Sequence, residues 1–343
     1  MPDVHGGPDA QGRAVHDFST NANACGPCPS ALAAVQAADA SRYPDPAYTA
    51  LKERLAAFHG VVRERIVVAG SASEFIVRMT AAFAGRTHGA VMVPPFSYGD
   101  YAQAARAHGL VVRRPHDASA GAPLRAVWAC EPSSPLGQAE AGLGARLDAL
   151  PPGVPLVLDR AYEPLRLQGE PALDAAQLDR VWQLWSPNKA LGLTGVRGGY
   201  AIAPLDDADG LARQLNRRAP SWPLGAHAVA MLDAWTAEAT RQWLADCLPT
   251  LRAWKTQQQA LCRALGWQVL PSDANFFCAR PLAPLDFHAM LAHLRAAGIK
   301  LRDTASFGLA GHVRLGVLPP DSQHALAQAW RAFAGPANPV VEP

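Results

Sequence analysis

The sequence predicts an α/β protein with a mostly parallel central sheet flanked by helices and a smaller α+β domain. Three observations support this fold class. Short apolar runs alternate with helical patterns through the middle of the chain, the 343 residues suffice for more than one domain, and longer helical patterns begin near Pro220. Apolar residues make up 49% of the chain and charged residues 17%, which is typical of a globular protein.

Seven apolar runs are predicted to be the strands of the central sheet. Several are apolar at consecutive positions, as expected for strands that are covered on both faces. Helical patterns such as Glu74–Phe83 and Tyr101–Ala107 lie between them, so most strands should run parallel. The predicted strands are Ile66–Gly70, Val91–Pro95, Val111–Pro115, Ala126–Glu131, Leu156–Asp159, Val181–Ser186 and Gly199–Ala203.

The C-terminal part of the chain is predicted to be the smaller domain. Two long helical patterns, Ala226–Cys247 and Thr250–Leu265, precede short strands near Asn275–Ala279 and His312–Val317. We therefore expect a large domain over residues 45–222. The N-terminal segment, residues 1–44, should join residues 223–343 in a small domain.

Charge and terminal sequence exclude several kinds of partner. The formal net charge is only +2, so neither nucleic acid nor an anionic membrane is indicated. The first ten residues lack a basic start followed by an apolar run, and no apolar stretch approaches the ~20 residues that span a bilayer. A cytoplasmic location is the resulting expectation.

The six cysteines are expected to be reduced thiols, because they are spread along a chain without an export signal. Cys25-Gly26-Pro27-Cys28 has the spacing of a dithiol redox motif, so a thioredoxin-like oxidoreductase is one alternative function. Such a motif should follow a strand, whereas a polar loop precedes this one. A zinc site would need a second ligand pair, and none is evident, so no metal is predicted.

Polar side chains occur where predicted strands end, which is where open α/β sheets bind ligands. Asp159 ends an apolar strand; it could cap a helix, or its carboxylate could hold a cationic heterocyclic nitrogen. Lys189 follows the next strand in an apolar, glycine-rich setting. A lone lysine is usually a solvated surface residue, but burial beside Arg197 would leave the amine nucleophilic. Ser186 and Arg197 suit a phosphate.

Two more strand ends suit the same ligand. The turn Gly70–Glu74, with Ala72 and Ser73, opens a helix whose free N–H groups suit an anion. Tyr98 also follows a strand and could stack on a flat cofactor. Each feature alone also fits an ordinary βα turn or a core aromatic residue.

Together these motifs resemble fold-type I pyridoxal 5′-phosphate (PLP) enzymes of the aminotransferase class. The similar branch contains histidinol-phosphate aminotransferase and threonine-phosphate decarboxylase. The resemblance extends roughly from Asp17 to Val317. Its most specific part is Ser186-x-x-Lys189 followed by Gly195-x-Arg197-x-Gly199-Tyr200.

The resemblance implies a role for each matching residue. Lys189 would carry PLP as a Schiff base, Asp159 would pair with the pyridine nitrogen, and Tyr162 would contact the phenolic oxygen. Residues that would bind the cofactor phosphate or stack on its ring are Ser186, Arg197, Ala72, Ser73 and Tyr98.

The remaining matches concern the substrate and a second subunit. Arg314 matches the arginine that binds the substrate carboxylate, and Asn21 or Asn23 matches the segment that lines the substrate pocket. Tyr43 matches a tyrosine that reaches the phosphate in the neighbouring subunit, which implies a homodimer. One position departs from the family: Ser134 stands where an asparagine usually bonds the phenolic oxygen, and its hydroxyl could still donate.

The resemblance implies an aminotransferase for a small amino acid or amine, with a phosphate or another anion on the substrate as a hypothesis. The alternative is a PLP lyase like the threonine-phosphate decarboxylases of cobalamin biosynthesis. His5-Gly6-Gly7 and Asp17-Phe18-Ser19-Thr20-Asn21 resemble segments of those enzymes, and His5 is therefore a candidate substrate ligand. A degenerate, non-catalytic protein of the same fold is a third alternative.

Overall fold

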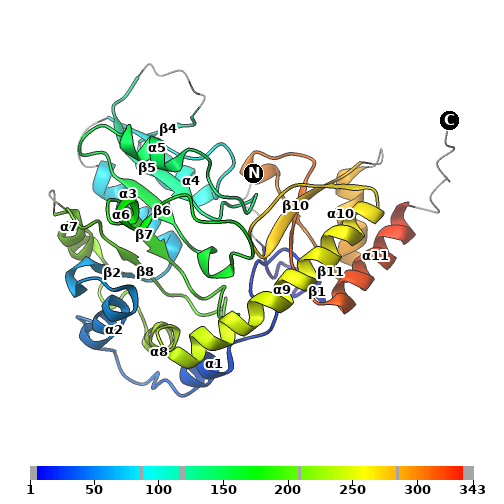
Figure 1. The fold of residues 1–343 in the computed structure, drawn as a ribbon, viewed down its shortest axis with the longest axis horizontal. Helices are drawn as coiled ribbons and strands as arrows, with labels where there is room; N and C mark the ends of the chain where they lie inside the picture. Colours follow the sequence, from blue (N-terminus) through cyan, green and yellow to red (C-terminus); the bar gives the residue numbers. More distant parts are fainter. Residues whose placement is uncertain are drawn as a thin grey trace.

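The computed structural model describes residues 6–84, 88–115, 117, 121–207, 210–282 and 286–334. The chain forms two parts that lie side by side (Figure 1). One contains a seven-stranded sheet with helices on both faces, and the other contains a four-stranded sheet with helices. The long helix α9 (Glu238–Ala264) runs past both parts. His5, a candidate substrate ligand, lies outside the described residues.

The large sheet has the strand order β2-β8-β7-β6-β5-β3-β4. Strands β3 to β7 pair in parallel, whereas β8 is antiparallel to both of its neighbours. The predicted mostly parallel α/β fold is thus confirmed, and all seven predicted strands are present. The strands are β2 (Ile66–Ala69), β3 (Ala90–Met92), β4 (Val111–Arg113), β5 (Leu124–Cys130), β6 (Leu156–Asp159), β7 (Trp182–Trp185) and β8 (Gly199–Ile202).

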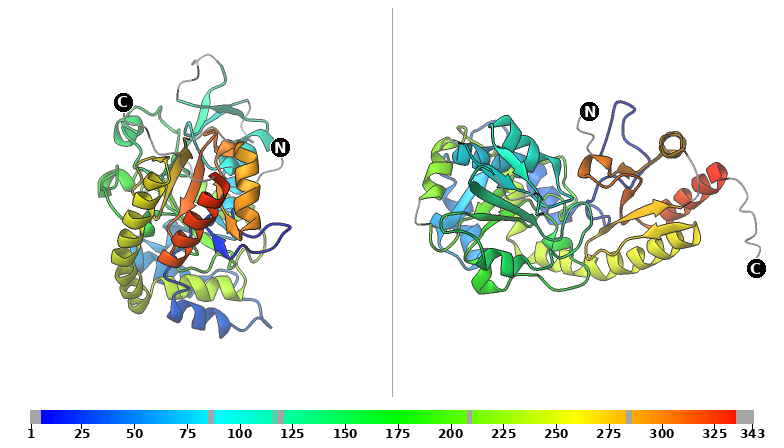
Figure 2. Two further views of the ribbon diagram at one scale, coloured as in Figure 1. Left: turned by 90° about the vertical axis from the view of Figure 1, so that its right-hand side faces the viewer. Right: turned by 90° about the horizontal axis from the view of Figure 1, so that it is seen from above.

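Helices cover both faces of this sheet because most positions of its strands are apolar and buried. In β2, Ile66 and Val68 face one core, while Val67 and Ala69 face the other. Figure 2 shows the resulting helix–sheet–helix layers. The helices of this part are α2 (Thr49–His59), η1 (Arg63–Arg65), α3 (Ala72–Ala84), α4 (Gly99–Ala107), α5 (Leu143–Asp148), η2 (Glu163–Leu165), α6 (Ala175–Leu178), α7 (Leu211–Arg218) and α8 (Ala226–Trp235).

The four-stranded sheet has the order β12-β13-β10-β9 and is antiparallel throughout. Its core includes Phe277 and Leu315 from the sheet and Leu294 and Leu326 from the helices. Its elements are β9 (Trp267–Val269), β10 (Phe276–Pro281), α10 (Phe287–Ala296), β11 (Ile299–Lys300), β12 (Arg302–Asp303), η3 (Ala305–Phe307), β13 (Val313–Gly316) and α11 (Pro320–Ala334). Strand β11 does not join this sheet; it pairs with the N-terminal strand β1 (His16–Asp17).

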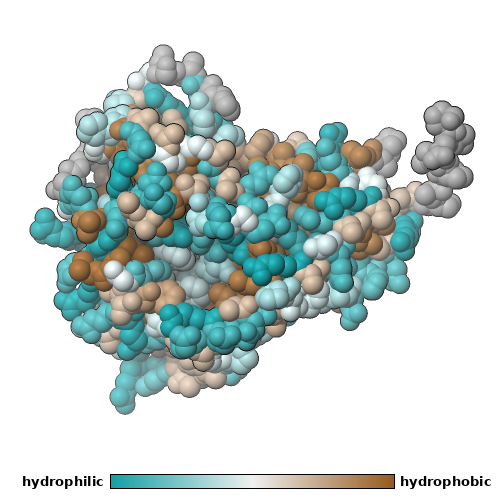
Figure 3. All heavy atoms as spheres, in the orientation of Figure 1, coloured by the Kyte–Doolittle hydropathy of each residue, from teal (hydrophilic) through white to brown (hydrophobic). Residues whose placement is uncertain are grey.

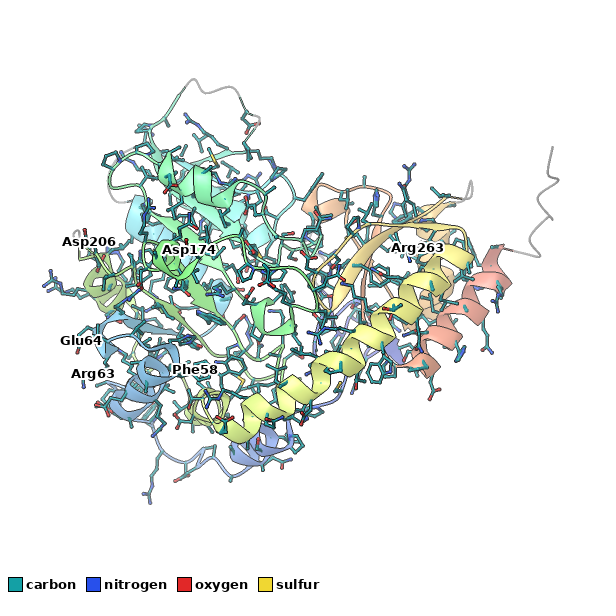
Figure 4. All side chains as sticks on the ribbon, viewed as in Figure 1. Phe58, Arg63, Glu64, Asp174, Asp206 and Arg263 are labelled. Atoms are coloured by element: carbon teal, nitrogen blue, oxygen red, sulfur yellow. The ribbon has the colours of Figure 1, made fainter. Side chains whose placement is uncertain are left out.

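One predicted boundary is wrong. The sequence suggested a helix break near Pro249, because proline cannot donate the backbone hydrogen bond of a helix interior. Instead the chain breaks at Thr236 and Ala237, and Pro249 lies inside α9. Burial of Cys247 and Leu251 on either side of the proline holds the helix against the core. Figure 4 shows how far α9 extends: Arg263 lies beside the four-stranded sheet, whereas Phe58 and Arg63 lie in the part that contains the seven-stranded sheet.

The N-terminal segment contacts both parts. Helix α1 (Pro29–Gln36) packs on α8, and the Phe18 carbonyl accepts a hydrogen bond from the Gly316 N–H at 2.7 Å. The predicted domain boundaries stay a prediction. Hydrophilic and hydrophobic residues are mixed over the face in Figure 3. No helix in the described ranges has the length and apolarity required to cross a bilayer.

Candidate active site

A cavity of about 490 Å³ lies between the carboxyl ends of the large-sheet strands and the four-stranded sheet. The N-terminal segment closes part of its wall. Eleven of the predicted site residues line this cavity: Asn21, Ala72, Ser73, Tyr98, Ser134, Asp159, Tyr162, Ser186, Lys189, Arg197 and Arg314. The structure therefore brings together side chains that lie far apart in the sequence.

Two predicted residues lie elsewhere. Asn23 is buried beside the cavity, where its Nδ2 donates to the Ala190 carbonyl at 3.2 Å, so it supports the lysine loop instead of lining the pocket. Tyr43 is 77% exposed and stacks on Trp222, with 4.4 Å between the ring centroids. Its predicted contact is with another subunit, so this position within one chain leaves the prediction open.

Asp159 ends β6 at the base of the cavity, beside the parallel strand β7. Its Oδ2 accepts a hydrogen bond from the Tyr101 hydroxyl at 2.7 Å, and its Oδ1 accepts one from the Ala161 N–H at 3.0 Å. Burial raises the pKa of this carboxyl above its ordinary value, while the Tyr101 bond and nearby Lys189 act in the opposite direction. A cationic partner in the cavity would relieve the cost of burying the charge.

Lys189 lies in the loop after β7, next to Asp159 on the same edge of the sheet. Its Nζ is 5.2 Å from the centroid of the Tyr162 ring, and Asn21 Nδ2 donates to the Tyr162 hydroxyl at 3.4 Å. The N-terminal segment holds this loop through backbone hydrogen bonds from Asn23 N to Lys189 O and from Cys28 N to Leu191 O. The backbone that carries the amine is thus held at Lys189 and at Leu191 by the N-terminal segment.

Another part of the cavity suits an anion. Helix α3 begins at Ala72, and the free N–H groups of its first turn favour negative charge. Ser73 Oγ lies 3.2 Å from the Tyr98 hydroxyl, and the buried Ser186 Oγ has no hydrogen-bond partner within the described chain. Arg197 lines the same cavity and is exposed. A Cβ on Gly199 would lie only 2.8 Å from the Trp185 carbonyl, which explains the glycine there.

The opposite wall carries two buried guanidinium groups, Arg302 on β12 and Arg314 on β13. Arg314 donates to Ser134 Oγ at 3.1 Å and to the Ser19 carbonyl at 3.2 Å. Arg302 donates to Ser306 Oγ at 2.7 Å. Since Ser134 is within reach of Arg314, the serine that replaces the expected asparagine supports the cation of this wall.

Comparison with known proteins identifies the family. The model of the family "Aminotransferase class I and II" matches residues 13–332. Histidinol-phosphate aminotransferase of Ruegeria pomeroyi is 30% identical over 93% of this chain and 91% of the relative. Aromatic amino acid aminotransferase of Thermobifida fusca is 31% identical over 95% and 92%. The chain belongs to the class I and II aminotransferases.

Solved structures show the same fold. Histidinol-phosphate aminotransferase from Sinorhizobium meliloti, in complex with PLP, matches with a TM-score of 0.80 at 21% identity, covering 97% of this chain and 96% of that one. L-threonine-O-3-phosphate decarboxylase from Porphyromonas gingivalis matches with a TM-score of 0.77 at 20% identity, covering 92% and 98%. The predicted fold type and family are confirmed, and family membership supports the predicted enzyme class and PLP cofactor.

The residues of this aminotransferase fit PLP. Asp159 is a buried carboxylate at the end of β6, Ser186 has a buried hydroxyl without a hydrogen-bond partner in the described chain, and Lys189 lines the same cavity. Ser134, Tyr162 and Asn21 line the same cavity as Lys189 and Arg314. The individual roles of these residues stay predictions.

The cavity residues that were not predicted as site residues include Tyr101, Arg302, Ser306 and Phe307. Tyr101 follows Tyr98 by one helical turn, so the i, i+3 spacing at the start of α4 could have revealed it. Arg302 and the short turn η3 gave no comparable signal. Their place in the cavity depends on the pairing of β12 with β13, which joins strands only two and four residues long.

The Cys25-x-x-Cys28 motif does not have the environment of a redox dithiol. Burial raises the pKa of the Cys25 thiol to about 12, with Cys247 acting in the same direction, whereas a reactive thiol needs a lowered value. Cys28 is fully buried at the start of α1. Both cysteines are free thiols, and their segment packs against the lysine loop through Gly26 and Gly192.

Proposed function

We propose that this enzyme transfers the amino group of a small amino acid or amine that also carries a phosphate. The observation that carries this proposal is the pair Arg302 and Arg314, two buried guanidinium groups in the same cavity as Lys189. An arginine pairs well with a carboxylate or a phosphate, and both guanidinium groups line the cavity. The names of the histidinol-phosphate aminotransferase relatives support a phosphorylated substrate.

Each residue then has a defined task. When bound, PLP supplies an electron sink for the bonds at the substrate α-carbon. The Lys189 amine binds the cofactor and accepts or returns the α-carbon proton. Asp159 holds a proton on the ring nitrogen, and Tyr101 orients the carboxylate through its hydrogen bond. Arg314 fixes one substrate anion and so decides which α-carbon bond is activated.

Decarboxylation of a phosphorylated amino acid is the second candidate function. One observation favours it: Gly6 and Gly7 line the cavity, and they belong to the segment that resembles threonine-phosphate decarboxylases. The Gly7 N–H donates to Ser19 Oγ at 2.9 Å, and Lys300 Nζ donates to the Gly7 carbonyl at 2.5 Å. The N-terminal segment is thereby held beside Arg302 and Arg314.

One experiment separates these functions. The PLP-loaded protein is incubated with histidinol phosphate or O-phospho-L-threonine, each with and without 2-oxoglutarate. Formation of glutamate supports the aminotransferase, and release of carbon dioxide without a keto acid supports the lyase. Lys189→Ala should abolish both products and the cofactor absorbance band, whereas Lys52→Ala should change neither. If the unmodified protein binds PLP and gives neither product, both proposals are wrong.

We also propose that the active enzyme is a homodimer in which Tyr43 reaches the cofactor phosphate of the neighbouring subunit. The exposed stack of Tyr43 on Trp222 supports this, because it holds Tyr43 at the surface, where a neighbouring subunit can reach it. Trp222 has a positive φ of 48°, and its Nε1 donates to the Pro44 carbonyl, so the stack is held in one arrangement. Sedimentation of the PLP-loaded protein tests the assembly. A monomer with full activity would contradict it, and Tyr43→Phe should weaken PLP binding in the dimer.

A further inference from the structure

The two arginines of the cavity lie opposite each other on neighbouring strands. Arg302 of β12 is the register partner of Arg314 of β13 in the antiparallel pair. Side chains at such positions share one face of the sheet, and like charges there repel each other. Both side chains are buried, so solvent screens this repulsion weakly. Each guanidinium group also has hydrogen-bond partners of its own: Arg302 donates to Ser306 Oγ and the Asp303 carbonyl, and Arg314 donates to Ser134 Oγ and the Ser19 carbonyl.

The ring of Phe307 contacts both guanidinium groups. Its centroid lies 4.7 Å from the guanidinium carbon of Arg302 and 5.3 Å from that of Arg314. Arg314 also lies beside the Phe276 ring, 5.6 Å from the centroid of that ring. The face of an aromatic ring attracts cations, so one ring stabilises both charges while excluding them from its own volume. Phe307 is itself 7% exposed, which leaves little room for it to move.

The turn that carries Phe307 is fixed by several hydrogen bonds. Thr304 Oγ1 donates to the carbonyls of Leu309 at 2.6 Å and His312 at 2.9 Å, and the Ala305 N–H donates to Asp303 Oδ1 at 2.8 Å. Ser306, next to Phe307, accepts the hydrogen bond from Arg302. The turn η3 therefore sets the position of the ring and of one guanidinium group together.

We propose that Phe307 is a specificity-determining residue that fixes the spacing between Arg302 and Arg314, and thereby the distance between two anionic groups on the substrate. This inference rests on the proposed function and deepens it. Two separate anion sites select a substrate that carries both a carboxylate and a second anion. Without the ring, the distance between the two flexible side chains is no longer fixed, so dicarboxylates of different lengths should bind with similar affinity.

Straight-chain dicarboxylates from malonate to adipate measure this spacing directly. Their binding to the PLP-loaded protein is followed by calorimetry, with acetate as the single-anion reference. We expect the unmodified protein to prefer one chain length. Phe307→Leu should weaken binding of the preferred dicarboxylate by at least about fivefold, flatten the length profile, and change acetate binding less than about twofold, because loss of one cation–π contact is a modest effect.

Three variants control this experiment. Phe307→Tyr keeps the ring and should keep the length profile, and Phe307→Met should resemble Phe307→Leu if the latter folds poorly. Phe333→Leu makes the same change on α11, outside the cavity, and should behave as the unmodified protein. The inference is wrong if the unmodified protein shows no preferred length, or if Phe307→Leu and Phe307→Met keep the same profile.

The result is separable from the proposed function. The cofactor absorbance band reports PLP binding independently of the dicarboxylate profile. A normal band with an unchanged profile overturns only the role of Phe307. An absent band overturns the proposed function, and the profile is then measured on the protein without PLP, where the same two outcomes decide for or against Phe307.

Discussion

The two walls of the cavity are built in different ways. On the large-sheet side, Asp159, Ser186 and Lys189 follow two neighbouring parallel strands, so backbone hydrogen bonds of the sheet set their positions. On the opposite side, Arg302 and Arg314 stand on a short antiparallel pair. They contact the Phe307 ring and donate hydrogen bonds to the side chains of Ser306 and Ser134 and to the carbonyls of Asp303 and Ser19. The cofactor side of the site is thus placed mainly by parallel strand pairing, and the substrate side depends more on side-chain contacts.

From this difference we expect substitutions in the two walls to affect different properties of the enzyme. A substitution in the large-sheet wall removes a group from the cofactor while the backbone around it persists. A substitution in the opposite wall lets neighbouring side chains rearrange, so that selectivity changes while the cofactor stays bound. Four variants test this distinction, in order of decreasing effect on turnover.

The largest effect is expected for Asp159→Asn. The amide cannot balance a cationic ring nitrogen, so turnover should fall by roughly a thousandfold, within the range seen for lost proton-transfer groups. Stopped-flow absorbance of the PLP-loaded variant with an amino acid measures this loss. Asp174→Asn, at an exposed helix cap, is the control and should retain full turnover. Equal rates for Asp159→Asn and the unmodified protein would remove Asp159 from the proposed mechanism.

Arg314→Lys should separate the two walls. Lysine keeps the charge but loses the paired hydrogen bonds of a guanidinium group, so KM for a substrate carboxylate should rise about tenfold to a hundredfold. The affinity for PLP should stay unchanged, as measured by titration of the cofactor absorbance. A parallel loss of PLP affinity would mean that the two walls do not act independently.

Tyr101→Phe removes one hydrogen bond within the large-sheet wall. The Tyr101 hydroxyl lowers the pKa of Asp159 against the effect of burial, so its loss should raise that pKa further. We expect turnover to fall about tenfold, the scale of one hydrogen bond to a charged group, with the largest loss at acid pH. A pH–rate profile that keeps its shape would show that Tyr101 does not act through Asp159.

Lys255→Met changes a buried contact between the two parts of the molecule, outside the cavity, and should hardly affect turnover. Lys255 is buried on α9 and donates to the Ser272 carbonyl, next to Asp273, whose N–H bonds the Gly137 carbonyl. Burial lowers the pKa of this amine from 10.5 to about 8. Between these two values the unfolded chain binds more protons than the folded protein, so stability should rise with pH.

The size of this effect follows from the shift. Since one pKa unit corresponds to about 1.4 kcal/mol, the unmodified protein should gain roughly 3 kcal/mol relative to Lys255→Met between pH 8 and 10.5. Urea unfolding across this range measures the gain. Thr256→Ala, one position along α9 and exposed, should follow the unmodified protein. Parallel stability curves for all three proteins would show that the amine is not strained by burial.

The same contrast explains what could be predicted from the sequence. All seven strands of the large sheet could be predicted, because each is a short and largely apolar run. Asp159 and Lys189 were found because strand ends meet at one edge of such a sheet. The two-residue strand β12 and the turn η3 carry no apolar period, and their place depends on contacts between distant residues. Arg302 and Phe307 were therefore missed.

The predicted helix break near Pro249 was wrong for a related reason. Local preference argues for a break at proline, but the burial of Cys247 and Leu251 outweighs one lost hydrogen bond. Ser134 is a further case. The sequence gives its identity, whereas its hydrogen bond with Arg314 depends on how the two parts of the molecule are placed.

The docking of the N-terminal segment has a consequence for synthesis of the chain. The Phe18 carbonyl accepts a hydrogen bond from the Gly316 N–H, and β1 pairs with β11, so this segment can bind only after β11 and Gly316 have been synthesised. On the ribosome, the strands of the large sheet are all made before these binding partners. The lysine loop that this segment braces is therefore completed later than the sheet that carries it.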